Sequence, residues 1–102
     1  MPTLTIKSLH CVETQGIGDD DTYITIGGEK VWGVVVMGED DKQPVNIDYH
    51  FSRKAWVQIW EKDSGGDDLI GGFEVQSTHR GEKRHNIKGD GSEYWVYYSV
   101  KG

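Results

Sequence analysis

The stretch AWVQIWEKDSGGDDLIGGFEV, residues 55–75, contains the pattern that decides the fold. Its first part places Val57 and Ile59 on one side of the chain and Trp56 on the other, which is the period-two alternation of a β-strand. A glycine-containing acidic turn follows, and an apolar segment resumes at residues 69–75. The stretch therefore predicts two consecutive strands joined by an acidic turn.

The same pattern recurs along the whole chain, whereas no window keeps helical apolar spacing for three turns. We predict an all-β protein, an antiparallel β-sandwich of about eight strands in a single domain spanning residues 1–102. Leu4, Ile6 and Ser8 alternate in one phase, and the phase changes at Leu9 and Cys11, which indicates a β-bulge there. The predicted strands cover residues 4–12, 22–26, 30–37 (interpreted as buried on both faces), 44–51, 55–61, 69–75, 84–88 (a short edge strand) and 93–100.

Composition narrows the class of protein. The net charge of −6 argues against nucleic acid as the main partner, because phosphate backbones require a basic surface. The single cysteine, Cys11, cannot form an internal disulfide and is predicted to be a buried core thiol. The N-terminus lacks a signal-peptide pattern, and no segment is long and apolar enough to span a membrane. We expect a soluble, cytoplasmic protein, with export without a visible signal left open.

Acidic residues are concentrated in alternate turns. If consecutive strands run up and down, the turns near residues 16–21, 38–42, 61–68 and 89–91 lie at one end of the sandwich. Six of the 11 basic residues, namely Lys30, Arg53, Lys54, Arg80, Lys83 and Arg84, then fall at the opposite end. The acidic end takes thirteen of the 17 acidic residues, which are Glu13, Asp19, Asp20, Asp21, Glu39, Asp40, Asp41, Glu61, Asp63, Asp67, Asp68, Asp90 and Glu93.

Such a concentration of carboxylates is repulsive unless a cation or solvent compensates it. Calcium accepts six to eight oxygen ligands in flexible geometry, whereas zinc prefers nitrogen and sulfur. The acidic turn of residues 61–68 is therefore a candidate calcium loop. A solvated acidic surface that keeps the protein soluble is the alternative.

Two segments resemble the calcium loops of the C-two domain, the calcium-dependent phospholipid-binding β-sandwich named after protein kinase C. In residues 57–75, Glu61 and Asp63 match the first acidic pair of the family's third loop, and Asp68 matches its late aspartate, followed by the Leu-Ile-Gly ending. In residues 15–26, Gly18, Asp21 and Tyr23 match the first loop. The chain departs from the family pattern at Gln15 and Glu61, where the family has aspartates, and the third loop is one residue shorter.

The resemblance implies a calcium-binding module that docks a partner, such as anionic lipid. An unknown protein or a carbohydrate is also open as partner, and we expect no enzyme, since neither a Gly-x-Ser-x-Gly elbow nor a phosphate-binding loop is present. The main rival is a carbohydrate-binding sandwich with structural calcium and exposed aromatic side chains, and a small toxin or inhibitor is a third class. The expected calcium ligands are Asp21, Glu61, Asp63 and Asp68, assisted by Asp19, Asp20 or Asp67.

Two further stretches have open interpretations. The segment EYWVYYSV, residues 93–100, places aromatic side chains on both faces of its strand. One face is core, and the other is expected to pack in a second layer or to form a platform for sugar or protein. The segment THRGEKRH, residues 78–85, is interpreted as a solvated basic turn rather than a nickel or zinc site at its two histidines, with contact to an anionic surface as a further alternative.

Overall fold

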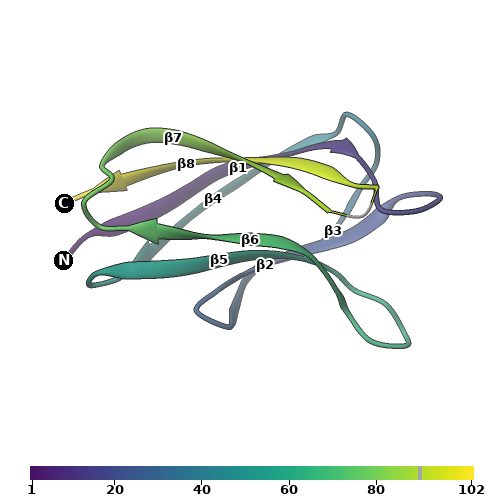
Figure 1. Cartoon of the computed structure of the whole chain (residues 1–102), viewed down its shortest axis with the longest axis horizontal. Coiled ribbons are helices and arrows are strands. Elements are labelled where there is room, and N and C mark those ends of the chain that lie inside the picture. Colours follow the sequence, from purple (N-terminus) through teal and green to yellow (C-terminus); the bar gives the residue numbers. More distant parts are fainter. Residues whose placement is uncertain (90) are drawn as a thin grey trace.

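The computed structural model describes residues 1–89 and 91–102 and contains eight strands (Figure 1). All eight predicted strands are confirmed. Among the described residues there is no helix, and so none that could cross a membrane. The strands are β1 (Thr3–Glu13), β2 (Asp20–Ile26), β3 (Glu29–Met37), β4 (Lys42–His50), β5 (Lys54–Glu61), β6 (Asp68–Gln76), β7 (Gly81–Lys88) and β8 (Glu93–Lys101).

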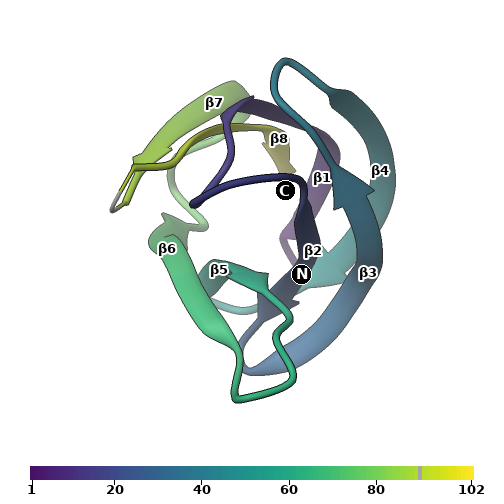
Figure 2. The same cartoon turned by 90° about the vertical axis from the view of Figure 1, so that its right-hand side faces the viewer.

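The strands form two antiparallel four-stranded sheets that pack face to face, which confirms the predicted β-sandwich (Figures 1 and 2). Sheet A has the order β4-β1-β8-β7 and sheet B the order β3-β2-β5-β6. The core between them consists of inward-facing residues from all eight strands, and Cys11 is a free thiol within it, as predicted. Its burial raises the pKa of the Cys11 thiol to about 11, so the thiol is unreactive at neutral pH.

The predicted bulge in β1 is present. The register of β1 shifts between Ile6 and Ser8 against both β4 and β8. Ile6 and Leu9 are both fully buried, so the two intervening residues, Lys7 and Ser8, lie outside the core. The bulge therefore adds one outward-facing residue to the outer face of sheet A.

Two predictions about individual strands are wrong. The valine-rich strand β3 is not buried on both faces but lies at the edge of sheet B, with Val34 39% and Val36 55% exposed. A run of valines is typical of a doubly buried strand, but the strand order decides which strand lies at an edge. Strand β7 is an edge strand as expected, yet it begins at Gly81, so Lys83 and Arg84 lie on a strand rather than in a turn.

The acidic turns gather at one end of the sandwich. In Figure 1 the β1–β2, β3–β4 and β5–β6 loops lie at the right-hand end, and both chain termini lie at the left-hand end. Of the acidic residues assigned to this end, Asp90 falls outside the described residues. The alternation of turns thus brings segments that are far apart in the sequence to one end of the molecule.

Candidate metal centre

The centre of the acidic end is a buried carboxylate, Asp20, at the start of β2. Its side chain is 0% exposed and accepts a hydrogen bond of 2.5 Å from the Tyr94 hydroxyl. The backbone N–H of Gln15 donates to both carboxylate oxygens, at 3.1 and 3.2 Å. Donors of this kind stabilise an ionised carboxylate, which would otherwise be costly to bury. Asp20 is therefore a fixed, buried acceptor beneath the loops.

Glu61, the last residue of β5, lies beside this group. It pairs with Thr22 of β2 on one side and with Asp68 of β6 on the other. Burial raises the pKa of Glu61 to about 7, together with a hydrogen bond to the Asp20 carboxyl and the negative charges of Asp20, Asp68 and Asp63. The charges of carboxyl groups from β2, the β5–β6 loop and the start of β6 thus act on Glu61 of β5, and near neutral pH a proton on Glu61 compensates part of their repulsion.

The side chain of Gln15 offers a neutral oxygen as a further candidate ligand. The side-chain oxygen Oε1 of Gln15 is buried and has no hydrogen-bond partner among residues 1–89 and 91–102. Buried polar atoms are rarely left without a partner. Amide oxygens and carboxylates are the ligands that calcium prefers, so the donor set fits that cation. However, the described part of the chain holds no group of three His, Cys, Asp or Glu side chains already close enough to share an ion.

The other predicted ligands make different contacts. Asp67 accepts a 2.5 Å hydrogen bond from the Tyr23 hydroxyl and one of 3.2 Å from the Asp63 N–H, and the Tyr23 hydrogen bond lowers the pKa of Asp67. Asp21 is exposed, one residue out of phase with the buried Asp20, so its side chain points to the opposite face of β2. The Asp21 carbonyl accepts a hydrogen bond from the Lys62 N–H at 2.8 Å.

The Asp19 side chain lies against the β3–β4 turn rather than against β5. A Cβ placed on Gly38 would be 2.8 Å from Asp19 Oδ1 and 3.5 Å from Asp41 Oδ2, so both side chains crowd the same glycine. Asp41 also caps this β3–β4 turn by accepting from the Gly38 N–H at 2.8 Å. Of the seven predicted ligands, Asp20, Asp63 and Asp68 are the groups whose charges raise the pKa of Glu61, although within the described residues no three of these side chains already lie close enough to share an ion.

Tyr94 is a residue of this site that the sequence analysis assigned only to the aromatic strand. Its hydroxyl contacts Asp20 and, at 3.2 Å, Thr22 Oγ1. Burial raises the pKa of the Tyr94 hydroxyl well above that of an exposed tyrosine. The sequence could indicate only in general terms that Tyr94 belongs to a polar site, because a buried tyrosine hydroxyl needs a polar partner. The identity of that partner depends on the packing of β8 against β2, which no local pattern indicates.

The chain is similar in fold to solved structures of C-two domains. A structure described as that of a C-two domain is 18% identical, with a TM-score of 0.67, and each chain covers 100% of the other. A calcium-bound structure of two C-two domains of extended synaptotagmin 2 is 12% identical, with a TM-score of 0.65, over 98% of this chain and 44% of that one. A C-two domain of a plant extended synaptotagmin 1 is 11% identical, with a TM-score of 0.59, over 98% of this chain and 92% of that one.

These likenesses show that the chain has the C-two fold, an all-β sandwich of eight strands in two antiparallel sheets. The chain spans less than half the length of the extended synaptotagmin 2 structure that it matches. No protein-family model and no curated protein sequence matches the chain.

Proposed function

We propose that this chain is a calcium-binding module and not an enzyme, with Asp20, Glu61, Asp63 and Asp68 as the carboxylate ligands and Gln15 Oε1 as a neutral one. The observation that carries the proposal is the position of Glu61 near Asp20, Asp63 and Asp68: its burial, a hydrogen bond to Asp20 and the charges of these three groups raise its pKa to about 7. A bound dication would replace the Glu61 proton and supply the positive charge that the four carboxylates lack.

The residues of the proposed calcium site have different roles. The Tyr94 hydroxyl and the Gln15 N–H hold Asp20 in place before any cation arrives. Asp63 and Asp68 are exposed, and Asp63 Oδ1 accepts only long hydrogen bonds of 3.4 Å from Ser64 Oγ and the Gly65 N–H, so both side chains can turn toward a cation. Tyr23 and Asp67 hold the β5–β6 loop on its outer side. The proposed site thus combines one fixed carboxylate, Asp20, with ligands that can adjust, which suits the flexible coordination of calcium.

Calcium is expected to control what the acidic end binds. Without a cation, the loops repel any anionic partner, and a bound calcium ion reduces that repulsion. Ile17, in the β1–β2 loop, is 107% exposed and offers an apolar contact at this end. These two properties favour anionic lipid, the partner that the C-two resemblance implies, over a protein or a carbohydrate at the loops.

Titration calorimetry of the chelator-treated protein at pH 8 tests the proposed site. We expect calcium to bind, magnesium to bind more weakly, and Asp63→Asn to weaken calcium binding by roughly tenfold, since one charged ligand is lost. Glu29→Gln, at the exposed start of β3 beyond the other end of β2, is the matched control and should bind calcium normally. An unchanged affinity in Asp63→Asn would remove Asp63 from the site, and no calcium heat in any protein would refute the proposal.

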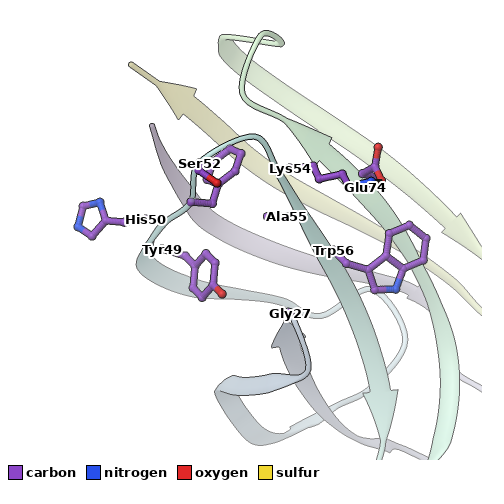
Figure 3. A pocket seen from close by; sticks show the side chains of 9 residues that line it. Gly27, Tyr49, His50, Ser52, Lys54, Ala55, Trp56 and Glu74 are labelled. Atoms are coloured by element: carbon purple, nitrogen blue, oxygen red, sulfur yellow. Dashed lines mark ion pairs between the residues drawn. The ribbon is translucent and has the colours of Figure 1, made fainter. Parts of the chain in front are cut away.

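A second candidate function, carbohydrate binding, rests on a hollow of about 420 Å³ near the opposite end (Figure 3). The Trp56 side chain borders it and is 47% exposed, Tyr49 lies across from it, and Lys54 and Glu74 form a 3.8 Å ion pair at its rim. An exposed tryptophan beside polar groups suits a sugar ring, which has both apolar and hydroxyl-bearing surfaces.

A neutral glycan array distinguishes this candidate. If carbohydrate is the ligand, we expect the wild-type protein to retain specific glycans, Trp56→Ala to lose them, and Trp95→Ala, on the other sheet, to keep them. Retention of no glycan by the wild-type protein would eliminate the carbohydrate-binding reading and leave the calcium proposal untouched.

A further inference from the structure

Strand β3 is an edge of sheet B that lacks the usual protection against pairing with another strand (Figure 2). Within the described residues it pairs with β2 alone, so one side of its backbone is left without a ladder. From Val31 to Met37 it contains no charged residue and no proline. Val34 and Val36 are 39% and 55% exposed. An exposed apolar edge of this kind is a template for a further strand.

The other three edge strands carry features that discourage such pairing. Strand β7 is charged along its length, with Lys83 and Arg84 near its centre. Strand β4 contains Pro44 and Asn46, the latter at a φ of 52°. Strand β6 contains two consecutive glycines, at positions 71 and 72. Charges, proline and irregular backbone are the means by which edge strands avoid association, so β3 is the edge most open to another strand.

The aromatic outer face of sheet A is less suited to a protein partner, because cations cover it. Lys42 Nζ lies 4.5 Å from the centre of the Tyr97 ring, and Arg84 Cζ lies 4.8 Å from the centre of the Trp95 ring. The expectation that Trp95 and Tyr97 pack beneath a second protein layer is thus wrong, since both are half-buried and cations lie over them.

An irregularity in β3 enlarges its apolar edge. The register against β2 shifts between Gly33 and Val35, so Val34 has no partner on β2. A bulge adds one residue to a strand, and here the added residue is an exposed valine. From Val35 to Met37 the strand pairs regularly with β2 again, so the edge keeps strand geometry there.

A second copy of the chain fits this edge because β3 is complementary to itself. If two copies of β3 run antiparallel about a two-fold axis at Val35, Val34 of each copy lies opposite Val36 of the other. Residues directly opposite each other in an antiparallel pair lie on the same face, so the exposed valines cover one another. The pairing thus buries apolar side chains that the single chain leaves in water.

The charges at the two ends of β3 are also complementary in this arrangement. Lys30 stands at the start of β3, whereas Glu39 and Asp40 lie in the turn that follows its end, and all three are exposed. Antiparallel pairing brings each Lys30 to the acidic turn of the other copy. Asp41, the remaining acid of that turn, would face Glu29, but its carboxylate is held toward its own turn by a backbone N–H at 2.8 Å.

The same arrangement keeps the two acidic ends apart. The β3–β4 turn lies at the acidic end of the sandwich, so antiparallel copies direct these ends to opposite ends of the dimer (Figure 1). Two chains that each carry a net charge of −6 would repel most strongly if their acidic ends met. None of the proposed calcium ligands lies on β3, so failure of the dimer would leave the calcium proposal unaffected.

We propose that the chain forms a two-fold dimer through β3, which joins the two copies of sheet B into one continuous antiparallel sheet. One strand edge buries less than the roughly 1,200 Å² of a standard stable interface, so we expect a concentration-dependent dimer with a Kd of roughly 10–100 μM. The dimer needs no calcium, because its contacts are main-chain hydrogen bonds, valine side chains and the charges of the chain itself.

Sedimentation velocity of the chelator-treated protein, from micromolar to near-millimolar concentration, tests the dimer. We expect the wild-type protein to shift from monomer to dimer, and Val34→Lys/Val36→Lys to weaken association by roughly tenfold or more, because it places like charges opposite each other. The matched control, Trp56→Lys/Leu69→Lys, adds the same charge at two side chains of sheet B that are 47% and 48% exposed and lie outside β3. It should dimerise like the wild-type protein, and thermal unfolding will check that both variants fold.

A charge exchange tests the antiparallel orientation of the two copies. Lys30→Glu should weaken the dimer severalfold, and Lys30→Glu/Glu39→Lys should restore it, since each exchanged pair again has opposite charges. Glu39 receives the lysine because Asp40 has a φ of 64°, at which a lysine side chain is strained. A wild-type protein that stays monomeric throughout, equal losses in the valine variant and its control, or an exchange that fails to restore association would overturn the proposal.

Discussion

Replacing Glu61 by glutamine should stabilise the calcium-free protein at pH 8. The pKa of Glu61 is about 7 in the folded chain against an ordinary value of 4.5, so the folded state holds this proton more tightly than the unfolded state. The stabilisation linked to it is complete below pH 4.5 and is lost as the pH rises through 7. At pH 8 an ionised Glu61 faces Asp20, Asp63 and Asp68, and glutamine removes that repulsion while preserving the shape of the side chain.

The expected gain from Glu61→Gln is about 1–2 kcal/mol at pH 8, after allowance for solvent screening of this half-buried group. It corresponds to a rise in Tm of about 5–10 °C for a domain of this size. Thermal unfolding at pH 8 and pH 5 measures it, and the gain should shrink at pH 5, where wild-type Glu61 is largely protonated. Glu29→Gln is the matched control and should change stability by less than about 0.5 kcal/mol at either pH. A Glu61→Gln variant that is destabilised at pH 8 would contradict the description of the site.

Removing the Tyr94 hydroxyl should have the opposite effect. Tyr94→Phe keeps the ring in the core but deprives the buried Asp20 carboxylate of its 2.5 Å donor. Hydrogen bonds to a buried charge contribute about 1.5–3 kcal/mol, so we expect a loss of about 2 kcal/mol at pH 8 and a fall in Tm of about 10 °C. Calcium affinity should also fall, because Asp20 loses part of the support that holds it beneath the loops.

Tyr97→Phe is the matched control for this change. Tyr97 lies on the same strand, but its side chain faces the outer surface of sheet A. Chemical denaturation at pH 8 should therefore show little change for Tyr97→Phe and a clear loss for Tyr94→Phe. Equal stabilities of the two variants would mean that the Tyr94 hydroxyl does not support the Asp20 carboxylate.

The sequence predicted the strands well because their signal is local. Alternation in β2 and β5 identified Ile24, Val57 and Ile59 as inward residues, and all three are fully buried. The bulge in β1 was also predictable, since Ile6 and Leu9 cannot both face the core without it. The environment of β3 was not predictable in the same way, because the order of strands in a sheet depends on contacts between distant segments.

The gathering of the acidic loops at one end was predictable from the sequence, but the contacts of the individual acidic side chains were not. The C-two resemblance favoured Asp21, whereas the structure buries Asp20 beside Glu61 and leaves Asp21 exposed. A difference of one residue in the start of a strand moves a side chain to the opposite face. In the sequence, Gln15 stood out only because it departs from the family pattern. Among the described residues its buried side-chain oxygen has no hydrogen-bond partner, and it is therefore the neutral ligand in the proposed site.

Thermal unfolding of chelator-treated wild-type protein and Glu61→Gln at pH 8, each with and without millimolar calcium, tests the central claim most directly. A cation that binds only the folded state at a hundredfold excess over its Kd stabilises the protein by about 2.7 kcal/mol. We predict a clear rise in the Tm of the wild-type protein with calcium, and a variant that begins with a higher Tm but responds much less. Equal calcium shifts in both proteins, or none in the wild-type protein, would contradict a calcium site built around Glu61.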